Sequence, residues 1–181
     1  TQYVDDMRDV IRNRALAYDK AGSRWKLDMH LGNDRGGGGA LLSTAPDLIR
    51  WNEALNATLG AGISRKLQEP ATLSNGRKVG YARGLYLDVN RAGSVVWHSG
   101  GSAGYRSALA RFPESGLSVA IMCNSGEGAD SRVAFVRRIF DIFVPASATV
   151  NAEPPRSPGR VEGIDAKSKA GLFFNERTGQ P

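Results

Sequence analysis

The stretch Val95-Val96-Trp97-His98-Ser99-Gly100-Gly101-Ser102-Ala103-Gly104-Tyr105 decides how the rest of the chain is interpreted. Its apolar first half predicts a β-strand, and its small residues predict a tight turn after His98. Glycine N–H groups beside an imidazole would also suit a wall that binds a developing oxyanion. On the local residues alone, a tight turn whose glycines only satisfy backbone geometry is favoured over such a wall.

Composition places the chain among globular proteins of ordinary size. Its 181 residues, 41% of them hydrophobic and 23% charged, suffice for one core and a fragment of a second domain. Because no run of eighteen apolar residues occurs, no membrane span is predicted. The net charge of +6 is spread along the chain, and no cluster of basic residues is interleaved with aromatic ones, so a nucleic-acid partner is not expected.

The first half of the chain is predicted to hold a hairpin and a helix. Residues 1–13 are polar and compatible with a helix, and residues 14–29 alternate around a turn as a hairpin does. Thr44 (or Ser43) as the cap, with Pro46 and Asp47 in the first turn, then predicts a capped helix start. Four apolar side chains follow at helical spacing on one face, with the tryptophan predicted in the core: Leu48, Trp51, Leu55 and Leu59.

The second half is predicted to form a four-stranded meander followed by a helix. The expected strands are residues 79–89, 94–98, 105–112 and 117–123, joined by turns rich in Gly, Pro and Asn. A helix is expected to start at Asp130 or Ser131. Its apolar face is able to lie on the sheet and comprises Val133, Val136, Ile139, Phe140 and Phe143.

Composition changes sharply after residue 144. Residues 145–159 hold four of the eight prolines, which predicts an extended linker over 145–168. The lone apolar run 170–174 then resembles the first strand of a further domain over 169–181 that is cut off.

Several motifs with possible chemistry do not fit their surroundings. The G-x-S-x-G string at 100–104 is followed by a strand pattern rather than a helix, and the S-x-x-K string at 23–26 lies in a predicted hairpin. His30 and His98 lack zinc-ligand spacing, so no metal site is predicted. Cys123 lies in an apolar run and is interpreted as a buried small residue rather than a nucleophile.

In combination, these segments resemble the C-terminal part of the serine β-lactamase-like family, which includes penicillin-binding proteins, class C β-lactamases, D-aminopeptidases and esterases. The resemblance covers about residues 1–144 and rests on residues 36–48 with Trp51, on Trp97-His98-Ser99-Gly100-Gly101, on Gly104-Tyr105-Arg106-Ser107, and on the strand 117–124. It implies an α+β fold, with an antiparallel sheet flanked by helices, incomplete in this chain.

The resemblance also implies roles for four residues. His98-Ser99-Gly100 fits the family's third motif, Lys-Thr-Gly or His-x-Gly, on a strand that borders the cleft. His98 would be the polar partner of the catalytic groups, Ser99 would bind them or the substrate, and the Gly101 N–H would be one of two oxyanion-hole donors. A histidine is only fractionally charged near neutrality, which favours an amidase, peptidase or esterase over a β-lactamase.

The family's nucleophilic S-x-x-K and its tyrosine motif do not occur upstream of residue 15, where they are expected. The chain is therefore interpreted either as a piece of a longer protein or as a subunit completed by a separate chain, and by itself as inactive. The implied parent is a serine hydrolase of small-molecule or peptide substrates that needs no metal or organic cofactor. The alternative is a non-catalytic penicillin-binding-protein-like module. The resemblance implies a periplasmic or extracellular location.

Overall fold

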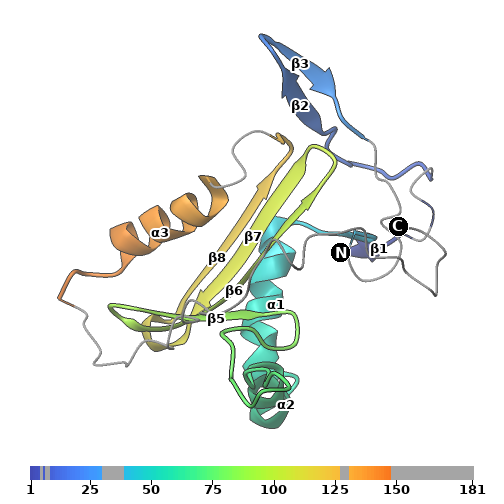
Figure 1. Ribbon diagram of the computed structural model, residues 1–181. Coiled ribbons are helices and arrows are strands. Elements are labelled where there is room, and N and C mark those ends of the chain that lie inside the picture. The colour runs from blue at the N-terminus through green and yellow to red at the C-terminus, as the bar shows by residue number, and fades with distance from the viewer. Residues whose placement is uncertain (5, 7–8, 30–38, 127–130, 148–181) are drawn as a thin grey trace, which may run out of the picture.

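A four-stranded antiparallel sheet forms the centre of the computed structural model, which describes residues 1–4, 6, 9–29, 39–126 and 131–147 (Figure 1). The strand order follows the sequence: β5 (Tyr86–Asn90), β6 (Gly93–Ser102), β7 (Tyr105–Phe112) and β8 (Leu117–Cys123). A short 3-10 turn, Pro113–Ser115, joins the last two strands. The predicted meander is confirmed, and with helices on both faces of the sheet the fold is α+β.

The strand β6 differs from its predicted extent. It continues through His98 and the glycines to Ser102, so the turn expected after His98 is wrong. Only Ala103 and Gly104 form the turn, and Ala103 has a φ of 46°, in the left-handed region that two-residue hairpin loops require. The first predicted strand is shorter than expected because residues 79–85 leave the sheet and only residues 86–90 pair regularly.

The helix α3 (Ser131–Phe143) covers one face of the sheet (Figure 1). It buries Val136 and Phe140 against a set of sheet residues that alternate toward it: Ala108, Ala110, Phe112 and Val119. The rings of Phe112 and Phe140 lie 4.6 Å apart between centroids. Arg91, in the turn between β5 and β6, lies over the Phe140 ring and pairs with Asp141 at 3.0 Å. These contacts fix the helix on the sheet.

The helix α1 (Ala45–Ala57) lies across the other face, followed by α2 (Ala61–Leu67) (Figure 1). The predicted cap is confirmed, because the Asp47 N–H donates to Thr44 Oγ1 at 3.3 Å. Leu55 is buried as expected, whereas Trp51 is 50% exposed, so its predicted place in the core is wrong. Asn52 is buried instead, and its amide donates to the carbonyl of Ala110 at 3.2 Å. The inner face of α1 is thus rotated away from Trp51.

Two short pairs of strands complete the described fold. The strand β1 (Gln2–Tyr3) pairs with β4 (Leu41–Leu42), so the helix-compatible pattern at the start of the chain does not give a helix among its described residues. The predicted hairpin is present, but it starts later than expected, with β2 (Tyr18–Ala21) paired to β3 (Arg24–Leu27). It projects beyond the end of the central sheet (Figure 1).

Several predictions concern residues outside the described part of the chain. They include His30, the glycine run 36–38, most of the linker expected over 145–168, and the strand expected over 170–174. Where helices are described, none has the length and apolar character needed to cross a membrane.

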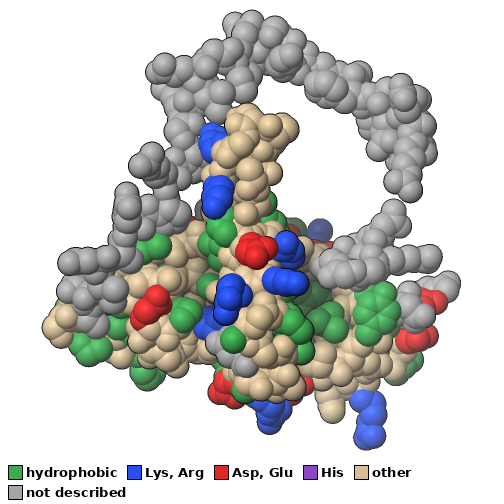
Figure 2. Space-filling view, turned by 90° about the horizontal axis from the view of Figure 1, so that it is seen from below, with side chains coloured by type: hydrophobic (Ala, Val, Ile, Leu, Met, Phe, Trp, Pro, Cys, Tyr) green, Lys and Arg blue, Asp and Glu red, His purple; other side chains and the backbone are tan. Residues whose placement is uncertain are grey.

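Apolar side chains remain exposed on both helical layers, and Figure 2 shows such side chains among charged ones on one face of the molecule. On α3, the predicted apolar face is divided, because Phe140 is 4% exposed and Phe143 is 69% exposed. The helix ends at Phe143, and the next residue, Val144, is again buried with the core, so the Phe143 side chain points away from the sheet.

The two phenylalanines therefore provide a matched test of the core. Phe140→Ala should lower the free energy of unfolding by about 3–5 kcal/mol, because it leaves a cavity beneath Phe112. Phe143→Ala should change it by less than about 0.5 kcal/mol. Urea unfolding followed by circular dichroism measures both values. Equal effects would contradict the described placement of α3.

Candidate functional site

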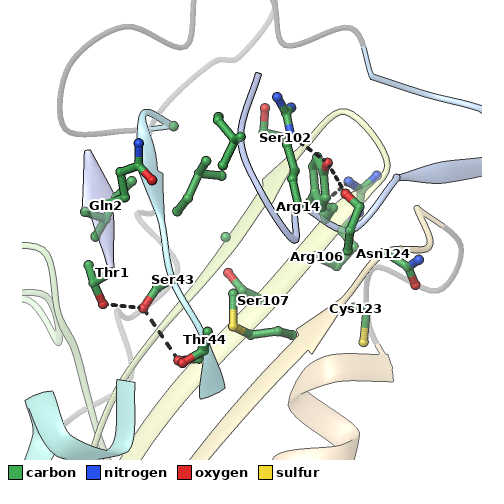
Figure 3. A pocket seen from close by; sticks show the side chains of 18 of the residues that line it. Thr1, Gln2, Arg14, Ser43, Thr44, Ser102, Arg106, Ser107, Cys123 and Asn124 are labelled. Atoms are coloured by element: carbon green, nitrogen blue, oxygen red, sulfur yellow. Dashed lines mark hydrogen bonds between the residues drawn. The ribbon is translucent and has the colours of Figure 1, made fainter. Parts of the chain in front are cut away.

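A cavity of about 790 Å³ lies where the β6–β7 hairpin ends (Figure 3). Its walls come from four parts of the chain: the hairpin end with the end of β8, residues 11–15, Thr1 with Gln2, and the residues leading through β4 into α1. Figure 3 shows Ser102, Arg106 and Asn124 at one end of the cavity and Ser43 with Thr44 at the other. Small side chains on the hairpin, including Ser107, keep this space open.

The backbone of β6 has an unpaired edge next to this cavity. Its pairing with β5 stops at Trp97, whereas its pairing with β7 continues to Ser102. From His98 to Ser102, no strand in the described part of the chain lies beside β6 on the β5 side. This edge is where an extended ligand could approach the backbone.

The register determines which backbone groups face that edge. In a two-residue hairpin the residues that flank the turn form a hydrogen-bonded pair, and such pairs alternate with non-hydrogen-bonded ones. Ser102 and Tyr105 flank the β6–β7 turn, so Gly101 is in a non-hydrogen-bonded pair with Arg106. The β5–β6 turn, flanked by Asn90 and Gly93, gives the same alternation. The N–H and C=O groups of Ser99 and Gly101 therefore point to the unpaired edge.

Side chains on β6 alternate between the two faces of the sheet. His98 lies opposite Leu109, whereas Ser99 lies opposite Ala108, which belongs to the core under α3. The side chains of His98 and Ser99 therefore point to opposite faces. Gly100 and Gly101 line the cavity, but His98 and Ser99 are not among its described lining residues. The structure thus brings the two glycines to the cavity and places His98 beside it.

Aromatic rings surround the imidazole of His98. Tyr86, the first residue of β5, stacks on it with ring centroids 5.3 Å apart and also stacks on Trp97. Tyr81 makes a polar contact, with its hydroxyl oxygen 3.2 Å from Nε2 of His98. Sequence analysis did not identify Tyr81 as a site residue, because nothing in the local pattern links it to His98, which lies seventeen positions later.

Two guanidinium groups lie at the end of β6. Arg132, in the first turn of α3, donates to the carbonyl oxygen of Gly100. Arg106 donates to the carbonyls of Ala103 and Tyr105 at 2.6 and 2.7 Å, which also holds the hairpin turn. Both side chains lie next to the backbone of Gly101.

A third arginine lies on the same face of the sheet as His98. Arg111 is only 7% exposed, and burial lowers the pKa of its guanidinium group. It lies opposite Val96 in the register, further from the cavity than Gly100 and Ser107. Its guanidinium group therefore lies in the interior beside the sheet and does not form part of the cavity wall.

The β6–β7 turn is held against the start of β2. The N–H of Gly104 donates to the carbonyl of Asp28 at 3.1 Å, and its Cα lies so close to the backbone of Tyr18 that a Cβ would approach within 2.6 Å. Tyr105 donates its hydroxyl proton to the carbonyl of Ala15 at 2.6 Å and accepts from Arg14 at 3.2 Å. These contacts bring residues 11–15 to the cavity.

The structural setting of the other motifs agrees with their rejection. Ser102 ends a strand and is followed by β7 rather than by a helix, and Ser23 with Lys26 lies in the β2–β3 hairpin. Cys123 is partly buried and lines the cavity, so it is less enclosed than expected. Within the described residues, no three His, Cys, Asp or Glu side chains gather as metal ligands would.

Comparison with known proteins decides the family. The family model described as "Beta-lactamase" matches residues 1–142, which include every strand and helix described here except the last residue of α3. The chain belongs to the beta-lactamase family. Two curated relatives of this beta-lactamase-family chain are named D-aminopeptidase.

The D-aminopeptidase of Brucella anthropi is 29% identical over 116 residues, which cover 63% of this chain and 22% of the relative. The D-aminopeptidase of Gluconobacter oxydans is 28% identical over 141 residues, which cover 75% of this chain and 26% of the relative. The beta-lactamase-family chain thus corresponds to about a quarter of the length of these relatives.

The close approach at Gly104 can be tested by a matched pair of substitutions. Gly104→Ala should lower the free energy of unfolding by about 1–3 kcal/mol, because its Cβ would push against the backbone of Tyr18. Gly62→Ala, inside α2 and with open space around its Cα, should be neutral or slightly stabilising. Thermal unfolding of both variants measures the difference. A neutral Gly104→Ala would show that β2 does not dock there.

Proposed function

We propose that residues 1–144 are the C-terminal part of the catalytic domain of a serine hydrolase that cleaves amide or ester bonds. In this proposal the reaction passes through an acyl-serine intermediate, and the nucleophilic serine lies outside this chain. Residues His98, Ser99, Gly100 and Gly101 form one wall of the active site. Membership of the beta-lactamase family and the two relatives named D-aminopeptidase support a hydrolase.

The observation that carries the proposal is the direction of the Gly101 N–H. It points to the unpaired edge of β6, beside the cavity and away from β7. When a serine oxygen attacks a carbonyl carbon, the carbonyl oxygen gains negative charge, and a fixed N–H donor stabilises that charge. Because Gly101 has no side chain, the substrate carbonyl can approach this donor closely. Arg106 and Arg132 add positive charge behind it.

In this proposal, His98 is the polar partner of the catalytic groups and lies in the same wall of the active site as Gly101. It lies three residues before Gly101, next to the pair that Trp97 makes with Tyr86, the first residue of β5, and its imidazole can donate, accept or carry a proton. It would interact with the serine and its proton-transfer partners when these are supplied from outside residues 1–181. Ser99 would contribute its backbone groups, which face the same edge.

The substrate we favour is a small peptide with an amide bond to be cleaved, as the name of the two relatives suggests. An imidazole at position 98 is a weaker fixed cation than a lysine, so a β-lactam carboxylate is a less suitable ligand. For such substrates a periplasmic or extracellular location, as the family resemblance implies, is part of the same proposal.

The role of the Gly101 N–H is tested by two substitutions in the full-length protein. Gly101→Pro removes the proposed donor and should reduce the rate of acylation about 10²–10³-fold. It removes no β6–β7 ladder bond, because this N–H faces the unpaired edge. Gly101→Ala keeps the N–H, and its Cβ would meet only arginine side chains at 3.4 Å or more, so its acylation rate should change less than tenfold. Equal rates for both variants would contradict the assignment, and circular dichroism checks that both fold.

The position of the nucleophile is tested by labelling the full-length protein with a fluorophosphonate and mapping the adduct by mass spectrometry. The expected adduct is on a serine outside residues 1–181. An adduct on Ser99, Ser102 or Ser23 would overturn the proposal. No adduct, together with reversible binding of peptide, would favour the non-catalytic binding module instead.

A further inference from the structure

The side chains of Tyr81 and His98 are in direct polar contact where the unpaired edge of β6 begins. The hydroxyl oxygen of Tyr81 lies 3.2 Å from Nε2 of His98, which is within hydrogen-bond distance. Both side chains are partly buried. Tyr86 packs against both rings, 4.8 Å from Tyr81 edge-on and 5.3 Å from His98 in a stacked arrangement, measured between ring centroids. The imidazole is therefore held by one polar and one apolar contact.

The backbone holds Tyr81 in place on two sides. Its carbonyl accepts from the N–H of Ala71 at 2.8 Å, and Tyr81 also forms an isolated antiparallel bridge with Tyr86. The carbonyl of the preceding residue, Gly80, accepts from the N–H of Leu87 at 2.9 Å, and a Cβ at Gly80 would meet the Leu87 carbonyl oxygen at 3.0 Å. The chain before β5 thus folds back tightly and presents Tyr81 where the unpaired edge of β6 begins.

We propose that Tyr81 is a positioning residue: its hydroxyl occupies Nε2 of His98 and leaves Nδ1 as the nitrogen that serves the reaction. This inference rests on the proposed function of His98. Tyr81 itself is not assigned a contact with substrate.

The chemistry of the imidazole gives the reason. A neutral imidazole has one nitrogen that donates and one that accepts, and the bond made by one nitrogen determines the state of the other. A tyrosine hydroxyl can either donate to a bare Nε2 or accept from Nε2–H. In both cases Nε2 forms a hydrogen bond, which opposes a 180° rotation of the imidazole ring about its bond to Cβ. Among the described residues, no hydrogen-bond partner is seen at Nδ1 of His98.

Tyr86 provides a matched control for this hydroxyl. It has the same side chain, contacts the same imidazole ring, and its own hydroxyl makes no hydrogen bond to any described residue. Tyr81→Phe removes the polar contact to His98, whereas Tyr86→Phe removes a hydroxyl but keeps the stacked ring. A difference between the two variants reports the Tyr81–His98 hydrogen bond alone.

The first measurement is a ¹H–¹⁵N spectrum of the ring nitrogens in full-length protein labelled at histidine, with His98→Gln identifying the signals of His98. In the unsubstituted protein we expect the Nε2 signal to be shifted by its hydrogen bond to the Tyr81 hydroxyl. Tyr81→Phe should remove that shift and change the tautomer ratio reported by both ring nitrogens, and Tyr86→Phe should leave them unchanged. Unchanged nitrogens in Tyr81→Phe, or equal changes in both variants, would overturn the proposal. Equal melting temperatures establish that both variants fold.

The second measurement is steady-state hydrolysis of a peptide amide by the same variants. Tyr81→Phe should lower kcat about fivefold, the usual effect of one net hydrogen bond, with KM unchanged. Tyr86→Phe should stay within about twofold of the unsubstituted protein. An unchanged kcat in Tyr81→Phe would overturn the positioning role. If His98→Gln retains full activity while Tyr81→Phe still shifts the nitrogens, the proposed role of His98 fails and the contact remains.

Discussion

The candidate site depends on a difference in strand length. β6 is paired with β7 to its last residue, but β5 begins opposite Trp97, so the stretch from His98 to Ser102 has no strand beside it on that side. An unpaired strand edge is normally a risk of aggregation, which proteins cover or shorten. Here the edge carries glycines, adjoins a cavity and has arginines behind it. An edge of this kind can bind an extended ligand through its backbone.

Close backbone approaches hold the parts around this edge in place. Gly104 lets the β6–β7 turn contact the backbone of Tyr18, and Gly80 lets the segment before β5 fold back on Leu87. The first contact brings residues 11–15 to the cavity, and the second brings Tyr81 to His98. A Cβ at either glycine would separate segments that build the site. The sheet that carries these contacts is packed on one face by α3 and on the other by α1.

Local patterns predicted most elements, and their failures have physical causes. The alternation in β7 and β8 and the cap at Thr44 act within a few residues, so sequence alone was enough for them. Trp51 and Phe143 were expected in the core because they share a helical face with buried residues. Their exposure depends on where each helix sits on the sheet, which spacing does not encode. The turn expected after His98 was wrong because pairing with β7 keeps a glycine-rich segment extended.

The sequence by itself determined the meander and the candidate residues His98, Ser99, Gly100 and Gly101, because strand alternation, turn residues and short motifs act over a few positions. The α+β class was implied by the resemblance of these motifs to a known family. Only the tertiary structure decided that Ser99 and His98 point to opposite faces and that Gly101 faces an unpaired edge, because both depend on register across three strands. The contact of Tyr81 with His98 belongs to the same group. It arises where one strand ends beside another, and no local pattern specifies that point.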